Sequence, residues 1–140
     1  MQNYTIYALI SMLFAGFTSV IAKLGLQDIS SELGLAVRTC FVFGFVVIFT
    51  ILVVPKEQLA MLSRSNFSWL ALSAATTTAS WVFYYKALKL GDVSQVALID
   101  KGSFVVAVLF AWLILNEKPS MQVMLGCSLI LTGLFVVAQK

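Results

Sequence analysis

Residues 35–54 read LAVRTCFVFGFVVIFTILVV, an apolar stretch in which Arg38 is the single charged residue. A helix needs about 20 mainly apolar residues to cross the roughly 30 Å hydrocarbon core of a bilayer. A strand of a membrane barrel would instead alternate apolar and polar residues over about ten positions. Because a helix also satisfies its own backbone hydrogen bonds inside lipid, this stretch predicts a transmembrane helix.

The same pattern recurs along the whole chain of 140 residues, of which 61% are hydrophobic and 11% charged. In ordinary soluble domains, about a quarter of the residues are charged. We therefore predict an all-α membrane protein, with one transmembrane domain over residues 1–140 and five transmembrane helices. The five segments cover residues 5–22, 35–54, 67–88, 93–115 and 120–138.

Local sequence signals agree with these boundaries. Pro55 ends the second segment, because proline does not continue a helix comfortably. Asp92 and Gln95 have the spacing of a capping box at the start of the fourth segment. The polar run 116–120 predicts a tight turn before the fifth. The first segment lacks a basic n-region and a cleavage site, so we expect no removable signal peptide.

Five crossings would place the two termini on opposite sides of the membrane. Loop lysines and arginines normally set the orientation. One side would carry Lys56, Arg64 and Lys118. The other would carry Lys23, Arg38, Lys86, Lys89 and Lys140. This bias is weak, so both orientations, and insertion in both directions, stay open.

Several functional classes are disfavoured. The basic residues occur singly, whereas nucleic-acid binding needs a clustered basic stripe. The chain has no histidine, the commonest metal ligand. Cys40 and Cys127 lack metal or redox spacing and are interpreted as buried thiols. No nucleophile motif or phosphate-binding glycine loop is present. Asp28 and Glu32 are interpreted as solvated loop acids. We therefore expect no catalytic residue, no metal site and no cofactor.

Asp100 and Lys101 lie within the fourth segment, where burial of an ionisable group is costly. Neighbours in a continuous helix point about 100° apart, so we expect them not to form one simple solvated pair. Asp100 shares a small, slightly polar face with Ser103. One interpretation is a substrate or proton site. The other is a buried ion pair of Asp100 with Lys86, Arg38 or the Lys101 of a partner chain. Both interpretations can hold together.

Segment 67–88 has a polar and aromatic face, which would line a polar pathway or join helices. That face consists of Ser73, Thr77, Ser80, Trp81, Tyr84 and Leu88. Trp81 and Tyr84 are alternatively interfacial anchors, the role that we assign to Tyr85 and Lys86. Ser19 belongs to a small-residue face of the first segment. Gly126 and Gly133 lie seven residues apart in the last segment and predict a dimer seam.

Taken together, these segments resemble a single EamA-type unit of the drug/metabolite transporter superfamily. The likeness covers essentially the whole chain and rests on the order and spacing of short motifs. These motifs are 22–26 (AKLGL), 38–39 (RT), 80–91 (SWVFYYKALKLG), 96–101 (VALIDK), 115–118 (LNEK) and Gly126 with Gly133.

The resemblance implies secondary transport of a small metabolite or drug-like molecule, in a bacterial inner membrane. Typical members carry two such units, related by inverted topology, in one ten-helix chain, so this chain is similar to half of one. The first four helices would form the cavity and the fifth would hold the assembly together. Candidate substrate or ion cavity residues are Asp100, Lys101, Trp81, Tyr84, Thr77, Ser103, Arg38 and Ser19.

Inverted repeats suggest how a half unit works, because two copies inserted in opposite directions rebuild the pseudo-two-fold axis. We therefore expect an antiparallel homodimer with alternating access. A parallel dimer, a partner encoded elsewhere, and a non-transporting subunit or scaffold are the alternatives. The superfamily's four-helix exporters carry a carboxylate in their first helix, which this chain lacks. Asp100 is therefore our candidate for proton coupling.

Overall fold

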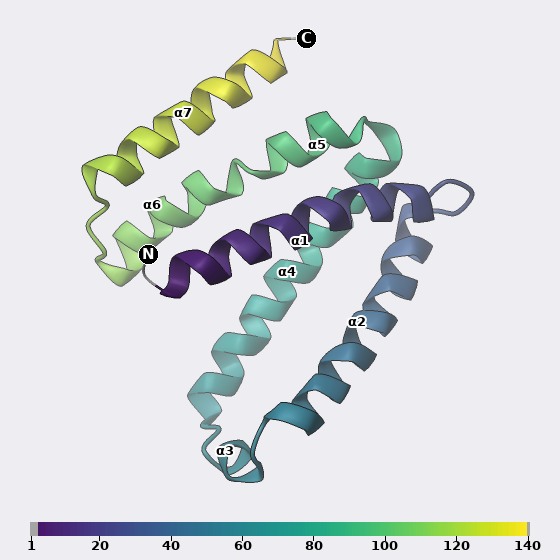
Figure 1. Cartoon of the computed structure of the whole chain (residues 1–140), viewed down its shortest axis with the longest axis vertical. Coiled ribbons are helices and arrows are strands. Elements are labelled where there is room, and N and C mark those ends of the chain that lie inside the picture. The colour runs from purple at the N-terminus through teal and green to yellow at the C-terminus, as the bar shows by residue number, and fades with distance from the viewer. Residues whose placement is uncertain (1–2, 140) are drawn as a thin grey trace. The chain divides into compact units, whose positions relative to one another are not determined.

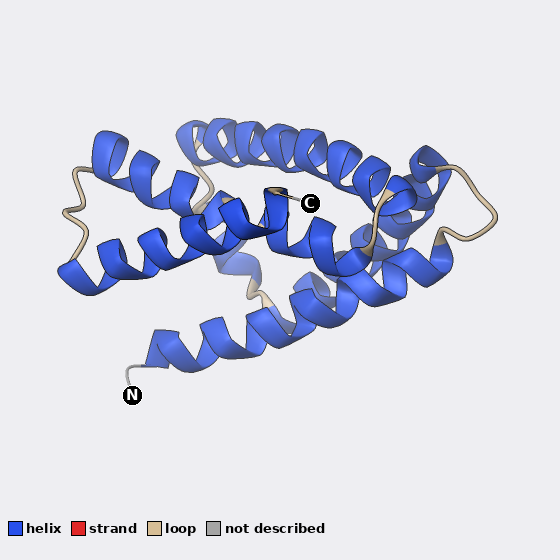
Figure 2. Cartoon of the chain, turned by 90° about the horizontal axis from the view of Figure 1, so that it is seen from above, coloured by secondary structure: helices blue, strands red, loops and turns tan. Residues whose placement is uncertain are grey.

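The computed structural model describes residues 3–139, which form helices, turns and loops without a strand (Figures 1 and 2). The helices are α1 (Asn3–Gly25), α2 (Ser31–Val53), α3 (Lys56–Ala60), α4 (Arg64–Leu90), α5 (Val93–Asp100), α6 (Ser103–Leu115) and α7 (Met121–Ala138). The chain divides into two compact units. We call Ile21–Leu90 the α2–α4 unit, and residues 3–20 with 91–139 the α5–α7 unit.

In the α2–α4 unit, helices α2 and α4 lie side by side and run in opposite directions, joined through α3 (Figure 1). α2 begins at Ser31, one turn before the predicted start at 35. Ser30 explains the difference, because its side chain accepts a hydrogen bond from the backbone N–H of Leu33. The predicted stop before Pro55 is confirmed. α3 was not predicted; Pro55 is its N-cap residue.

α4 covers 27 residues and extends beyond the predicted segment 67–88 at both ends. Its hydroxyl groups bond to the helix itself. Thr76, Thr77 and Thr78 each donate to a backbone carbonyl three or four residues earlier in the chain. Such bonds satisfy the hydroxyl donors without a neighbouring helix, which is the common arrangement for Ser and Thr within a helix.

In the α5–α7 unit, the predicted continuous helix over 93–115 is wrong at Lys101 and Gly102. The backbone N–H groups of these two residues bond to the carbonyls of Leu98 and Ile99, three residues back. These tight turns end α5 at Asp100, and α6 begins at Ser103.

The predicted capping residues of this unit behave differently from one another. Asp92 occupies the N-cap position of α5, but the described structure gives its side chain no capping hydrogen bond, so the predicted capping box does not form. Asn116 ends α6 in the left-handed conformation, with a φ of 56°. Ser120 then caps α7 by accepting from the N–H of Val123. Residues 116–120 connect α6 to α7 where the sequence predicted a tight turn, but they form an irregular loop.

Four stretches of the described residues are long and apolar enough to cross a membrane: Tyr4–Gly25, Ser31–Val53, Val93–Leu115 and Met121–Ala138. α4 is long enough, but its hydroxyl and lysine side chains keep it outside this group. Among the described residues, the buried hydrophobic side chains are Leu26, Tyr85 and Leu88. Most apolar side chains therefore face outward, as expected of a protein whose solvent is lipid.

Candidate functional site

Arg38 is the charged residue in the interior of α2, and its side chain is half-buried. Its guanidinium carbon Cζ lies 4.4 Å from the centre of the Trp81 ring and 5.9 Å from the centre of the Tyr85 ring. Both rings belong to α4. These distances are within the roughly 6 Å over which a cation is attracted to an aromatic face. We call these three residues the Arg38 cluster, and it joins α2 to α4.

Tyr85 was predicted to be an anchor at the membrane interface, and that prediction is wrong. Its side chain is 4% exposed, packed inside the α2–α4 unit. A sequence signal for this position existed, because Trp81 and Tyr85 are four residues apart and therefore share a helical face. Tyr84, which we predicted to line the cavity, is half-buried on the same helix.

Two lysines form reciprocal hydrogen bonds at one end of the α2–α4 unit. Lys23, in the last turn of α1, donates from Nζ to the carbonyl of Leu88 near the end of α4. Lys89, in the last turn of α4, donates to the carbonyls of Leu26 and Gln27, at 2.6 and 3.0 Å. Carbonyls at a helix end lack partners within the helix and carry partial negative charge. Lys23 therefore caps the end of α4, and Lys89 holds the turn that follows α1.

Glu32 was predicted to be a solvated loop acid, but it lies in the first turn of α2. Its carboxylate accepts a hydrogen bond from Ser31 at 2.9 Å and lies 3.5 Å from Nζ of Lys86. Lys86, predicted to be an interfacial anchor, is therefore one half of an ion pair between α2 and α4.

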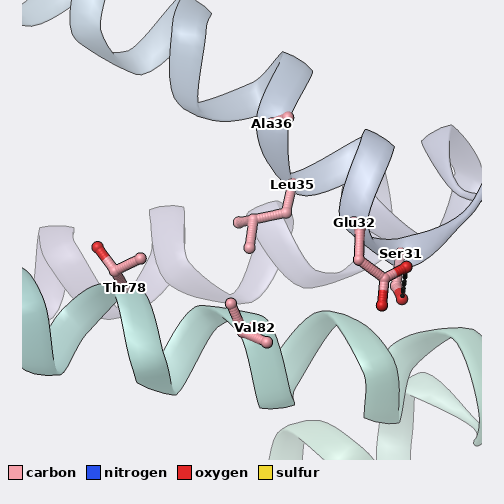
Figure 3. Close-up of a pocket in the computed structure, with 6 residues that line it drawn as sticks. All are labelled: Ser31, Glu32, Leu35, Ala36, Thr78 and Val82. Atoms are coloured by element: carbon pink, nitrogen blue, oxygen red, sulfur yellow. Dashed lines mark hydrogen bonds between the residues drawn. The ribbon is translucent and has the colours of Figure 1, made fainter.

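A cavity of about 290 Å³ opens next to Glu32 in the same unit (Figure 3). Its lining residues are Ser31, Glu32, Leu35, Ala36, Thr78 and Val82. Figure 3 shows Leu35 pointing from α2 toward α4, where Thr78 and Val82 lie. Ligand pockets usually measure about 300–1,000 Å³. This mainly apolar cavity is therefore suited to a small group rather than to a whole drug-sized molecule.

Asp100 and Lys101 lie together at the break between α5 and α6. Nζ of Lys101 is 3.9 Å from Oδ2 of Asp100, and their side chains are 37% and 38% exposed. We predicted that they would not form a simple pair, because neighbours diverge in a continuous helix. Lys101 keeps right-handed helical dihedrals, so the two side chains still leave the backbone in different directions, but their charged ends nevertheless come within ion-pair distance. Nζ of Lys101 also lies 5.6 Å from the ring centre of Phe104.

The remaining predicted cavity residues are dispersed along the helices. Ser19 is buried, at 7% exposed, and donates to the carbonyl of Ala15. Thr77 is exposed and donates to the carbonyl of Ser73 within α4. Ser103 is exposed at the first position of α6. Of the eight predicted cavity residues, the structure therefore brings together Arg38 with Trp81, and Asp100 with Lys101.

Gly126 and Gly133 lie on α7, and a Cβ atom added at either would meet no atom within 4 Å among those described. These glycines are therefore not used for close packing within either unit. A shallow groove of about 270 Å³ lies between α6 and α7, and Trp112, Cys127 and Ser128 are among the residues that line it. Within residues 3–139, no group of His, Cys, Asp or Glu side chains is placed to hold a metal ion.

Comparison with known proteins gives two findings. Residues 2–139 match the EamA-like transporter family. A protein from Sinorhizobium sp, named as an uncharacterized transporter in the cobO 3' region, is 34% identical over 137 residues. That alignment covers 98% of this chain and 97% of the relative. No solved structure gives a significant match.

Proposed function

This chain belongs to the EamA-like transporter family, and from that premise we propose that it is a secondary transporter of a small metabolite or drug-like molecule. The family match and the long apolar helices support an integral membrane transporter rather than an enzyme. The proposed location is a bacterial inner membrane, in line with the sequence resemblance.

The observation that carries the proposal is the break in the apolar span Val93–Leu115. It begins after eight residues of α5, about 12 Å from the start of the span at 1.5 Å per residue. The span there holds Asp100 and Lys101. Transporters often place substrate and ion sites where a membrane helix is interrupted near the middle of the bilayer. We propose that Asp100 carries the coupled proton at this break.

We propose that α4 is a fifth crossing. Its 27 residues correspond to about 40 Å of helix, more than the hydrocarbon core requires. The threonines that lower its apolar character donate their hydroxyl protons to backbone carbonyls of α4 itself. This reduces the cost of inserting them, because the donors already have partners. Five crossings would make the chain one half of a ten-helix inverted-repeat transporter.

We propose that two copies assemble as an antiparallel homodimer with alternating access. Few side chains are buried within the described part of one chain, so a second copy has a large apolar surface to cover. Gly126 and Gly133 offer open space for the close approach of another helix. The nearly balanced loop charges suit insertion in both directions. A parallel dimer and a partner encoded elsewhere are the competing assemblies.

Flux measurements test the transport function. Purified protein in liposomes, with an imposed proton gradient and a trapped pH dye, is exposed to sets of small metabolites. Protein-dependent and saturable proton movement with one set is the expected result, and protein-free liposomes are the control. No saturable flux with any set, together with co-purification of a distinct protein, would instead support a non-transporting subunit or scaffold.

Labelling in intact cells tests the antiparallel assembly. Cys40 and Cys127 are replaced by serine, and Gln139→Cys provides one exposed thiol at the end of α7. An impermeant reagent should label about half of this thiol before permeabilisation if insertion is dual. Labelling near zero or near completion would mean one orientation and would favour a parallel dimer or a partner protein.

A further inference from the structure

The position of Arg38 within α2 makes it unusual. The helix begins at Ser31, so the arginine lies seven residues into the span, about 10 Å along the axis. From Arg38 to the end of the helix the sequence carries no further charge. An arginine at this depth is costly to insert, and such residues normally mark a substrate or ion pathway.

The contacts of Arg38 leave one donor atom of its guanidinium without a hydrogen-bond partner among the described residues. Trp81 and Tyr85 engage the guanidinium as aromatic rings, and cation–π contact uses the charge rather than the N–H bonds. Atom Nη1 is buried and has no hydrogen-bond partner among the described residues. Buried polar atoms are nearly always bonded. The cluster therefore orients the guanidinium but leaves a buried donor to be satisfied.

The neighbouring charged side chains already have partners. Glu32 bonds to Ser31 and pairs with Lys86. Lys23 and Lys89 donate to backbone carbonyls at the helix ends. Arg38 therefore has no carboxylate partner among the described residues of the α2–α4 unit, and no second cation is part of the Arg38 cluster. One unmatched cation suits a monoanion, whereas a phosphate dianion would call for further basic groups.

We propose that Arg38, held by Trp81 and Tyr85, binds the carboxylate of a small organic anion, and that this anion is the transported substrate. This inference rests on the proposed transport function and adds the substrate class to it. A planar guanidinium presents two parallel N–H groups to the two oxygens of a carboxylate, which a lysine cannot do. The competing occupant is the Asp100 carboxylate, from the same chain or from a second copy.

Binding to purified protein in detergent tests the proposal, with thermal unfolding as the readout. The probes are two matched series, butyrate with butylamine and butyramide, and benzoate with benzylamine and benzamide. We expect saturable stabilisation by at least one carboxylate and by neither amine nor amide. Arg38→Gln should weaken carboxylate binding by about 10- to 100-fold, the usual effect of losing a charged hydrogen bond.

Two further variants separate recognition from folding. Arg38→Lys keeps the charge but loses the planar fork, so its affinity should fall between those of the wild type and Arg38→Gln. Lys86→Gln removes a cation from the same pair of helices, one that is paired with Glu32, and should bind the carboxylate as the wild type does. Equal weakening in Lys86→Gln and Arg38→Gln would overturn a specific role for Arg38.

Other outcomes overturn the proposal in distinguishable ways. Binding of the amines or amides alone, or of no probe, contradicts an anion site and leaves the flux experiment to decide transport. Arg38-dependent carboxylate binding without flux of that carboxylate keeps the anion site and contradicts the transporter. If carboxylates bind only after Asp100→Asn, and the double variant Arg38→Gln with Asp100→Asn differs in stability from the sum of the two single variants, Asp100 is the occupant.

Discussion

The two units of the chain handle their charged residues in different ways. In the α2–α4 unit, lysines cap helix ends, Glu32 pairs with Lys86, and Arg38 rests against aromatic rings. In the α5–α7 unit, the charged contacts of the described residues gather at the break between α5 and α6, where Asp100 lies 3.9 Å from Lys101. The α2–α4 unit thus uses charge to hold helices together, whereas the α5–α7 unit concentrates it where a helix is interrupted. This contrast predicts that mutations in the two units will affect different properties.

Asp100→Asn should give the largest functional effect and one of the smaller structural effects. We expect it to abolish proton-driven flux, because the amide does not exchange a proton. Stability should change by no more than about 1 kcal/mol, because partly exposed ion pairs contribute little. Flux and thermal unfolding are measured on the same preparation. Transport with an unchanged pH profile would remove Asp100 from the coupling step.

Leu88→Ala should give the largest loss of stability. It tests whether the α2–α4 unit is held together by its packed core. Leu88 is 0% exposed within the α2–α4 unit, so truncation leaves a cavity. We expect a loss of about 2 kcal/mol or more. Leu90 is the matched control, since it is 89% exposed two residues later, and Leu90→Ala should cost less than about 0.5 kcal/mol. Equal effects, measured by denaturant unfolding in micelles, would contradict the described core.

The sequence predicted the positions of the helices well because long stretches rich in apolar residues are visible from composition alone. The second, third and fifth segments all lie on observed helices, displaced at most by about a turn. The break at Lys101 and Gly102 was missed because apolar composition does not reveal it. Its residues lie in a stretch apolar enough to cross the membrane, and a change from four-residue to three-residue hydrogen bonds leaves the hydropathy unchanged. Gly102 was the available signal, and alone it is a weak one.

The candidate site was predicted as a set of residues but not as a set of contacts. Arg38 and Trp81 were both named from sequence, yet their contact depends on how α2 packs against α4, which periodicity does not encode. Tyr85 was assigned to the interface because aromatic residues near helix ends are common there. Tertiary packing overrode that tendency and buried it. The lysine caps were equally hidden, because Lys23 and Leu88 are 65 positions apart in the chain.

Lys89→Met should have a smaller effect than Leu88→Ala and probes the charged contacts of the α2–α4 unit directly. The variant keeps a similar side-chain length but removes the donor to the carbonyls of Leu26 and Gln27. Because Lys89 is exposed, we expect a loss of about 1 kcal/mol, typical of a cation at a helix C-terminus. Lys118→Met, in the exposed turn before α7, is the control and should be nearly neutral. A reversed order of the two losses in unfolding experiments would contradict the capping role.

Gly102→Ala should give the smallest effect and tests how tightly the break is packed. The backbone at Gly102 has a φ of −57°, which alanine adopts readily. Its Cβ would, however, lie 2.9 Å from Cδ1 of Leu134 and 3.1 Å from the carbonyl oxygen of Ile99. The methyl group of Leu134 can move aside, whereas the carbonyl is fixed by the turn that ends α5. We therefore expect a loss of up to about 1 kcal/mol, in which the close contacts outweigh the entropic gain of replacing glycine.

Gly126→Ala is the matched control for Gly102→Ala, because its Cβ meets no described atom within 4 Å and it lies in the interior of α7. Alanine there should stabilise the monomer by up to about 1 kcal/mol through helix propensity. The change in the free energy of unfolding is measured for both variants, on monomeric protein in detergent micelles. Opposite signs for the two changes would show that the α5–α7 unit is tightly packed at its break and open along α7. Stabilisation by both would mean that the α5–α6 turn gives way easily, so that the site around Asp100 is adaptable rather than rigid.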